Sequence, residues 1–150
     1  MAAIGLIDEE LTGSAIGAFF AVYDALGYGF LEHVYKAALE RELRARGHRV
    51  AREVGVTIVY KGEDLTVQRL DMVVDDRLVI EVKRKPEWPD IGSAQLFSYL
   101  RATRLEIGLL LNFGPKPSFK RMICPNARYS KAAPAPIIES AGGADAAPPA

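Results

Sequence analysis

The sequence predicts an α/β domain in which a mixed β-sheet is flanked by helices. Three observations support this class. Helical periodicity dominates the first part of the chain, apolar residues alternate in the middle, and a dense apolar run follows a third helical segment. Strands and helices that share one chain in this way favour a sheet with helices on its faces. The expected order is helix, helix, three strands, helix and two strands.

The first two predicted helices span residues 8–26 and 30–46. Their apolar side chains recur at intervals of three and four, which is the spacing of one helix face. Gly27 and Gly29 interrupt the pattern between them, and Gly47 is placed to end the second helix. We therefore expect a hairpin-like helix pair.

Three strands are expected next, over residues 50–60, 65–74 and 78–84. The first alternates apolar side chains as a half-buried strand does, and the turn Asp75-Asp76 separates the last two. This pattern predicts an antiparallel meander.

A third helix over residues 91–103 follows two prolines, with Asp90 in a capping position. The apolar run 105–113 is short enough for a buried strand parallel to residues 78–84, and residues 119–124 form an edge strand.

Composition limits the classes of function. The chain has 150 residues, 49% of them apolar, and its 19 basic and 19 acidic side chains cancel. Because constitutive nucleic-acid binders are usually basic, any contact with nucleic acid has to come from a local patch. We expect one domain over residues 1–130 and a disordered Ala/Pro/Gly-rich tail over 131–150.

The sequence offers no sign of secretion or membrane insertion. Cys124 is the single cysteine, which excludes a disulfide framework, and the longest uncharged run is too short to cross a bilayer. No signal peptide is recognisable, so a cytoplasmic location is expected.

The residues with the clearest chemical meaning lie on the second and third predicted strands. Glu81 and Lys83 are two apart, so they share one face, and Asp71 lies on the neighbouring strand. Two carboxylates and a lysine on adjacent strands are what a magnesium-dependent phosphodiester hydrolase needs. Arg69, two residues before Asp71, could bind phosphate or pair with Asp71.

Two predicted helices direct polar groups toward the same sheet. Glu32 and Tyr35 share a face of the second helix, and Gln95 and Tyr99 share a face of the third. Glu32 could instead compensate the helix dipole, and Tyr35 could belong to the core.

Several motifs in this order resemble the GxxExxY family of the PD-(D/E)XK nuclease superfamily. They are Gly29-Phe-Leu-Glu32-His-Val-Tyr35, Tyr60-Lys-Gly62, Arg69-x-Asp71, Glu81-x-Lys83, Ala94-Gln95-x-x-x-Tyr99-Leu100 and Gly108-Leu-Leu-Leu-Asn-Phe-Gly114. The resemblance implies a restriction-endonuclease-like fold and a nuclease that hydrolyses nucleic acid, DNA or RNA.

The resemblance also implies roles for individual residues. Glu32, Asp71, Glu81 and the carbonyl of Val82 would bind Mg²⁺ or Mn²⁺, and Lys83 would act on the attacking water or the phosphate. The catalytic set is Glu32, Asp71, Glu81, Lys83 and Gln95, and the substrate-binding candidates are Arg69, Tyr99 and Tyr35.

Other interpretations remain open. The trio on the strands could be a salt-bridged surface cluster, and the domain could be an inactive module that binds nucleic acid or a partner protein. The apolar run near residues 109–113 could be the edge of an assembly subunit, and a homodimer is a further possibility. A basic rim could surround the site, formed by Lys83, Arg84, Lys85, Arg101, Arg104, Lys116, Lys120 and Arg121.

Overall fold

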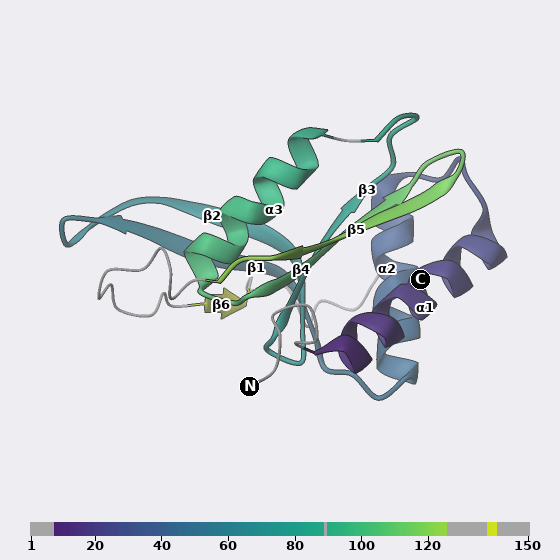
Figure 1. The fold of residues 1–150 in the computed structure, drawn as a ribbon, viewed down its shortest axis with the longest axis horizontal. Helices are drawn as coiled ribbons and strands as arrows, with labels where there is room; N and C mark the ends of the chain where they lie inside the picture. Colours follow the sequence, from purple (N-terminus) through teal and green to yellow (C-terminus); the bar gives the residue numbers. More distant parts are fainter. Residues whose placement is uncertain (1–7, 89, 126–137, 141–150) are drawn as a thin grey trace.

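The computed structural model describes residues 8–88, 90–125 and 138–140. Its helices are α1 (Glu9–Leu26), α2 (Glu32–Ala45) and α3 (Asp90–Thr103). Its strands are β1 (Val50–Tyr60), β2 (Glu63–Val74), β3 (Leu78–Lys83), β4 (Ile107–Phe113), β5 (Pro117–Ile123) and β6 (Ile138–Ser140). They form one mixed sheet, with α1 and α2 packed on one side and α3 on the other (Figure 1). The predicted α/β fold is confirmed.

The sheet has the strand order β5-β4-β3-β2-β1-β6. The predicted meander is present, because β1 pairs with β2 and β2 with β3 in antiparallel fashion. Asp75 and Asp76 form the tight turn between β2 and β3, with φ angles of 52° and 57°. Helix α3 then crosses over, so that β4 lies parallel to β3 as expected.

Two apolar layers hold the helices to the sheet. Phe19 of α1 and Tyr35 of α2 pack with Ile80 on one face. Leu96 of α3 packs with Val79 on the other, so neighbouring residues of β3 serve opposite layers. Strand β4 is buried along its whole length between β3 and β5. The interpretation of residues 109–113 as an assembly edge is therefore wrong, since both sides of β4 are paired and both faces covered.

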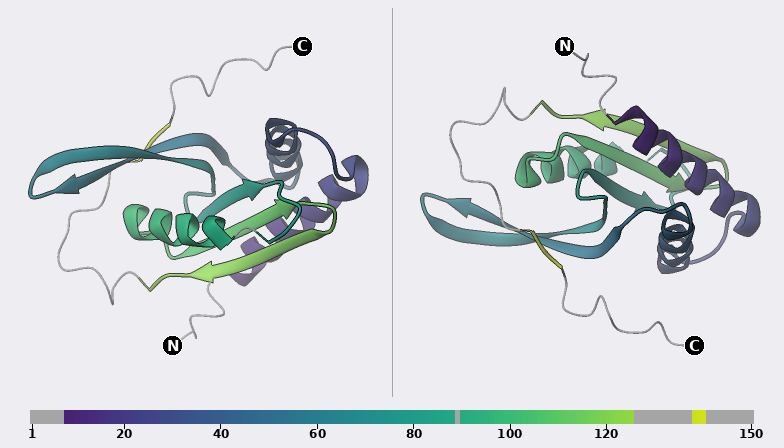
Figure 2. Two further views of the ribbon diagram at one scale, coloured as in Figure 1. Left: turned by 90° about the horizontal axis from the view of Figure 1, so that it is seen from above. Right: turned by 90° about the horizontal axis from the view of Figure 1, so that it is seen from below.

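The outer half of the β1–β2 hairpin projects away from the helices as an arm (Figures 1 and 2). Its apolar side chains are exposed, with Val59 at 54%, Tyr60 at 56%, Leu65 at 62% and Val67 at 58%. The expectation of a half-buried first strand is therefore correct as far as Ile58 and wrong at Val59 and Tyr60, because no helix covers the arm.

Both strands of the hairpin switch faces at one point. Val50 packs toward α1 and α2, whereas Val54 packs toward α3, although simple alternation would put both on one face. Glu53 lies between them with a φ of 52°, a left-handed conformation that breaks the alternation. Glu53 lies opposite Asp71, because the residues on either side of it pair with Met72 and Leu70. Asp71 is thus the residue of β2 at the switch.

The predicted tail begins at residue 131, and most of it lies outside the described residues. The exception is β6, in which Ile138–Ser140 pair with β1 at Val54–Val56. At these three residues the structure differs from the expected disorder, because the open edge of β1 offers unpaired backbone groups. Within the described part of the chain, no helix is both long and apolar enough to cross a membrane.

Candidate functional site

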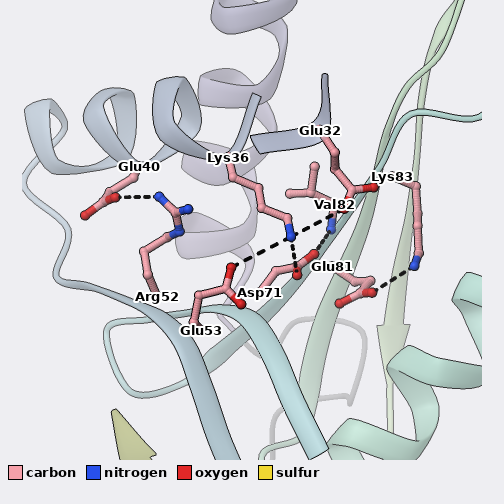
Figure 3. A network of polar contacts seen from close by, with 9 residues as sticks. All are labelled: Glu32, Lys36, Glu40, Arg52, Glu53, Asp71, Glu81, Val82 and Lys83. Atoms are coloured by element: carbon pink, nitrogen blue, oxygen red, sulfur yellow. Dashed lines mark hydrogen bonds and ion pairs between the residues drawn. The ribbon is translucent and has the colours of Figure 1, made fainter. Parts of the chain in front are cut away.

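Asp71 and Glu81 meet where the pairing of β2 with β3 ends. The last paired residues are Met72 and Ile80, so Asp71 and Glu81 occupy the next positions on the two strands. At this point a side chain replaces a backbone acceptor. Oδ2 of Asp71 accepts a hydrogen bond of 2.8 Å from the N–H of Val82 (Figure 3). This bond orients the Asp71 carboxylate.

Glu81 is the most deeply buried acid of the site, with 4% of the residue exposed. Its Oε2 lies 3.1 Å from Nζ of Lys83, and its Oε1 is buried without a hydrogen-bond partner among the described residues. Burial and then the negative charge of Asp71 raise the pKa of Glu81 to about 7, although the ammonium of Lys83 acts in the opposite direction. Glu81 is therefore a buried carboxyl group that keeps its proton to a higher pH than an exposed glutamate does.

Lys36 of α2 reaches the same place from the other side. Its Nζ lies 2.8 Å from Oδ1 of Asp71, and its side chain is 13% exposed. Burial by itself would lower the pKa of Lys36, but the hydrogen bond to Asp71 and the charges of Asp71, Glu32 and Glu53 raise it. Lys36 is therefore held as an ammonium ion among carboxylates.

Glu32 and Glu53 complete this group of charges. Nζ of Lys36 lies 3.4 Å from Oε2 of Glu32 and 3.8 Å from Oε1 of Glu53. Both acids are far more exposed than Asp71, with side-chain exposures of 40% and 42%. Glu32 thus joins the site through Lys36, and the structure records no direct bond between Glu32 and Asp71 or Glu81 in its described part.

Helix α3 contributes side chains to the site from the other face of the sheet. Burial and then the charges of Glu81 and Asp71 raise the pKa of Tyr99, so its hydroxyl lies within reach of their fields. Gln95, one turn earlier, has a buried Oε1 without a hydrogen-bond partner in the described part of the chain. Lys83 runs beside α3, since a Cβ on Gly92 would lie 3.5 Å from Cε of Lys83.

Two substrate-binding candidates lie elsewhere. Arg69 is exposed on β2, and the ion pair of Asp71 is made by Lys36. Tyr35 is fully buried and stacks on Phe113 with ring centroids 4.4 Å apart. Its hydroxyl donates to the carbonyl of Gly27 at 2.6 Å, so Tyr35 fastens the α1–α2 turn. The structure gives Tyr35 a supporting position in the core, as its helix face had suggested.

Three residues near the site were not predicted as part of it. The sequence offers one signal for Lys36, its four-residue spacing from Glu32 on the same helix. Glu53 has no signal beyond being an acid within a strand. Asn112, an amide in an apolar run, is 2% exposed and binds the loop that follows Lys83. It accepts from the N–H of Lys85 at 2.8 Å and donates to the carbonyl of Lys85 at 3.1 Å.

The donor set fits a hard divalent cation. Mg²⁺ and Mn²⁺ prefer carboxylate oxygens, and the buried Oε1 of Glu81 is an acceptor without a donor. However, no group of three or more His, Cys, Asp or Glu side chains in the described residues is arranged to hold a metal ion. Among the described acids, only Asp71 and Glu81 meet directly, because Glu32 reaches Asp71 through Lys36, and both oxygens of Asp71 already have a donor, Lys36 at Oδ1 and the N–H of Val82 at Oδ2.

Comparisons with known proteins agree with the fold. A model of the PD-(D/E)XK nuclease superfamily matches residues 9–122. A solved structure named "Crystal structure of SSO0001" is 20% identical in sequence, with a TM-score of 0.52. That match covers 65% of this chain and 53% of the other, so this chain spans about half the length of that protein, and at this identity the likeness concerns the fold alone. No curated protein matches the chain.

Proposed function

The chain belongs to the PD-(D/E)XK nuclease superfamily, and we propose that it is a metal-dependent nuclease that hydrolyses phosphodiester bonds in nucleic acid. The observation that carries this proposal is the buried pair Asp71 and Glu81, with an unpartnered oxygen on Glu81 and the ammonium of Lys83 3.1 Å from its other oxygen. Within the superfamily, the Gly29 to Tyr35 motif supports membership of the GxxExxY family.

The metal ligands in this proposal are Asp71, Glu81 and the carbonyl of Val82, with Glu32 as a further acid at the rim. A bound Mg²⁺ or Mn²⁺ would supply a water of lowered pKa and neutralise charge on the phosphate. Glu81 has to release its proton to act as a ligand, which its pKa of about 7 permits at neutral pH.

The remaining residues act on the substrate. Lys83 presents an ammonium beside Glu81, where it stabilises negative charge that develops on the phosphate. The amide of Gln95 has a buried Oε1 without a hydrogen-bond partner among the described residues, and this oxygen accepts a hydrogen bond from the attacking water and orients it. Tyr99 lies where the charges of Glu81 and Asp71 act on its hydroxyl, and Arg69 is an exposed cation on β2 for the nucleic-acid backbone.

A cleavage assay tests this function. Single- and double-stranded DNA and RNA are incubated with the protein and Mg²⁺ or Mn²⁺, and product formation is compared with that of Lys83→Ala and Glu81→Gln. We expect metal-dependent cleavage that these variants lose. Glu63→Gln is the matched control, because Glu63 is an exposed acid at the outer end of the arm. Cleavage that survives Lys83→Ala and Glu81→Gln would reject the assignment.

One observation favours a second candidate function. Since Asp71 is already paired with Lys36, the domain could bind nucleic acid or a partner protein without metal chemistry. Calorimetry separates the two functions, because the inactive module would bind a macromolecule while taking up neither Mg²⁺ nor Mn²⁺.

A homodimer remains a proposal as well, with the exposed apolar residues of the arm as its contact surface, and light scattering tests it.

A further inference from the structure

We propose that Lys36 is an internal cation that blocks the acidic site and is displaced from Asp71 when a divalent ion binds. This inference deepens the proposed function and rests on it. It makes Lys36 a positioning residue that sets the metal affinity of the site, a role that neither the motifs nor the family match assigns to it.

The first observation is that Lys36 and the proposed metal ion would both bind Oδ1 of Asp71. Oδ2 of Asp71 is held by the N–H of Val82 at 2.8 Å, which leaves Oδ1 as the oxygen for a metal ion. Oδ1 is the atom that Nζ of Lys36 contacts, also at 2.8 Å. A divalent ion bound at Oδ1, about 2.1 Å from that oxygen, would lie close to the ammonium of Lys36, and the repulsion between the two cations favours displacement of Lys36.

The second observation is that the ammonium of Lys36 has two other carboxylate partners, Glu32 and Glu53. Glu32 and Glu53 lie 3.4 Å and 3.8 Å from its Nζ, and both are closer to solvent than Asp71 (Figure 3). An ammonium that leaves Asp71 therefore keeps a carboxylate partner and gains water. Displacement does not leave a bare buried charge, which would otherwise oppose metal binding.

The second lysine of the site does not compete in this way. Lys83 contacts Oε2 of Glu81, and Oε1 of Glu81 has no hydrogen-bond partner among the described residues. Glu81 can thus bind a cation at an oxygen that its lysine does not contact, whereas both oxygens of Asp71 already have a donor. The two lysines therefore have different roles. Lys83 stays beside Glu81 during the reaction, whereas Lys36 pairs with Asp71 only when no metal ion is bound.

Calorimetric titration with Mn²⁺ tests this inference. We expect Lys36→Met to bind Mn²⁺ about tenfold more tightly than the unchanged protein, because the competing charge is gone. Lys36→Arg keeps a cation at this position and should bind as weakly as the unchanged protein. Lys61→Met, at the tip of the arm, removes an exposed lysine and should have no effect. Without metal, Lys36→Met should melt at a lower temperature, since Asp71 loses its partner.

Amine labelling of the unchanged protein supplies a readout that does not depend on a variant folding. An amine-reactive ester followed by peptide mass spectrometry should modify Lys36 slowly in chelator and several-fold faster in Mn²⁺. Lys61 and Lys85, which are exposed, should react equally in both conditions.

The possible failures are distinguishable. If Mn²⁺ binds equally to the unchanged protein and Lys36→Met, and labelling of Lys36 does not change, the inference is wrong and the metal-dependent nuclease stands. If neither protein binds Mn²⁺, the inference and the metal dependence both fail. Tight binding by Lys36→Met alone would support the inference.

Discussion

Oδ2 of Asp71 accepts the backbone N–H of Val82 at 2.8 Å, so a side chain continues the β2–β3 pairing beyond the last ladder residues. The same carboxylate therefore has a structural role toward β3 and a chemical role toward Lys36. Substitutions at this residue can separate the two, because an amide keeps an acceptor oxygen and loses the charge.

We expect Asp71→Asn to retain most of the stability and lose activity by about a hundredfold or more, because the charge is needed at the reacting centre. Asp71→Ala should lose activity and about 1–3 kcal/mol of stability, since the N–H of Val82 is left buried without an acceptor. Urea denaturation and the cleavage assay measure the two effects. Equal stability loss in both variants would show that the hydrogen bond to Val82 contributes little.

Glu81 should make the metal-free protein less stable as the pH rises. Its pKa is raised from 4.5 to about 7, so the folded state binds this proton more tightly than the unfolded state does. The free energy of unfolding is therefore highest, as far as Glu81 is concerned, below about pH 4.5. It falls progressively as the pH rises toward 7, because Glu81 has to lose its proton in the folded state. Glu81→Gln removes this dependence, and in chelator it should gain about 1–3 kcal/mol relative to the unchanged protein between pH 5 and pH 8.

Thermal melts at pH 5 and pH 8 measure this change. Glu87→Gln is the control, because an exposed acid should show no such difference. A Glu81→Gln variant whose relative stability is the same at both pH values would contradict the raised pKa.

Asn112 should hold Lys83 in place indirectly. Its amide binds both the N–H and the carbonyl of Lys85, two residues after Lys83. We expect Asn112→Ala to cost about 1–2 kcal/mol of stability, because partly buried backbone groups of Lys85 lose their partner, and to lower the catalytic rate. Ser118→Ala, opposite Asn112 on β5, serves as the control in denaturation and cleavage assays. An unchanged rate in Asn112→Ala would exclude a positioning role.

Nucleic acid should bind over the loops next to the carboxyl end of β3. Lys85 and Lys116 are exposed there, and the two loops touch, since a Cβ on Gly114 would clash with the carbonyl of Lys85. We expect Lys85→Glu with Lys116→Glu to weaken binding strongly at low salt. The salt dependence of binding should fall by about one unit of slope for each phosphate that the variant no longer binds.

Fluorescence anisotropy at several salt concentrations measures this prediction. Lys61→Glu, at the tip of the arm, is the matched control. A loss of affinity in Lys61→Glu alone would move the interface to the arm and away from the site.

Periodicity along the chain was sufficient to predict the elements close to their observed limits. The first strand, predicted over residues 50–60, is observed as Val50–Tyr60, and the predicted parallel pairing of the third and fourth strands is present. It also grouped Asp71, Glu81 and Lys83, because residue alternation and adjacent strands decide which side chains share a face. The exposure of the arm was missed, since burial of a strand depends on what covers it.

The linear order of residues was enough for the helices, the strands, the turn at Asp75-Asp76 and the acid–lysine pair of β3. All of these depend on neighbours within a few positions. The cation that meets Asp71 was decided by the tertiary structure, because α2 has to dock beside β2 before Lys36 can reach it. Helical periodicity places Lys36 on the polar face of α2, and the left-handed Glu53 breaks the alternation of β1 opposite Asp71. Long-range packing thus converts an ordinary helix-surface lysine into the partner of the proposed metal ligand.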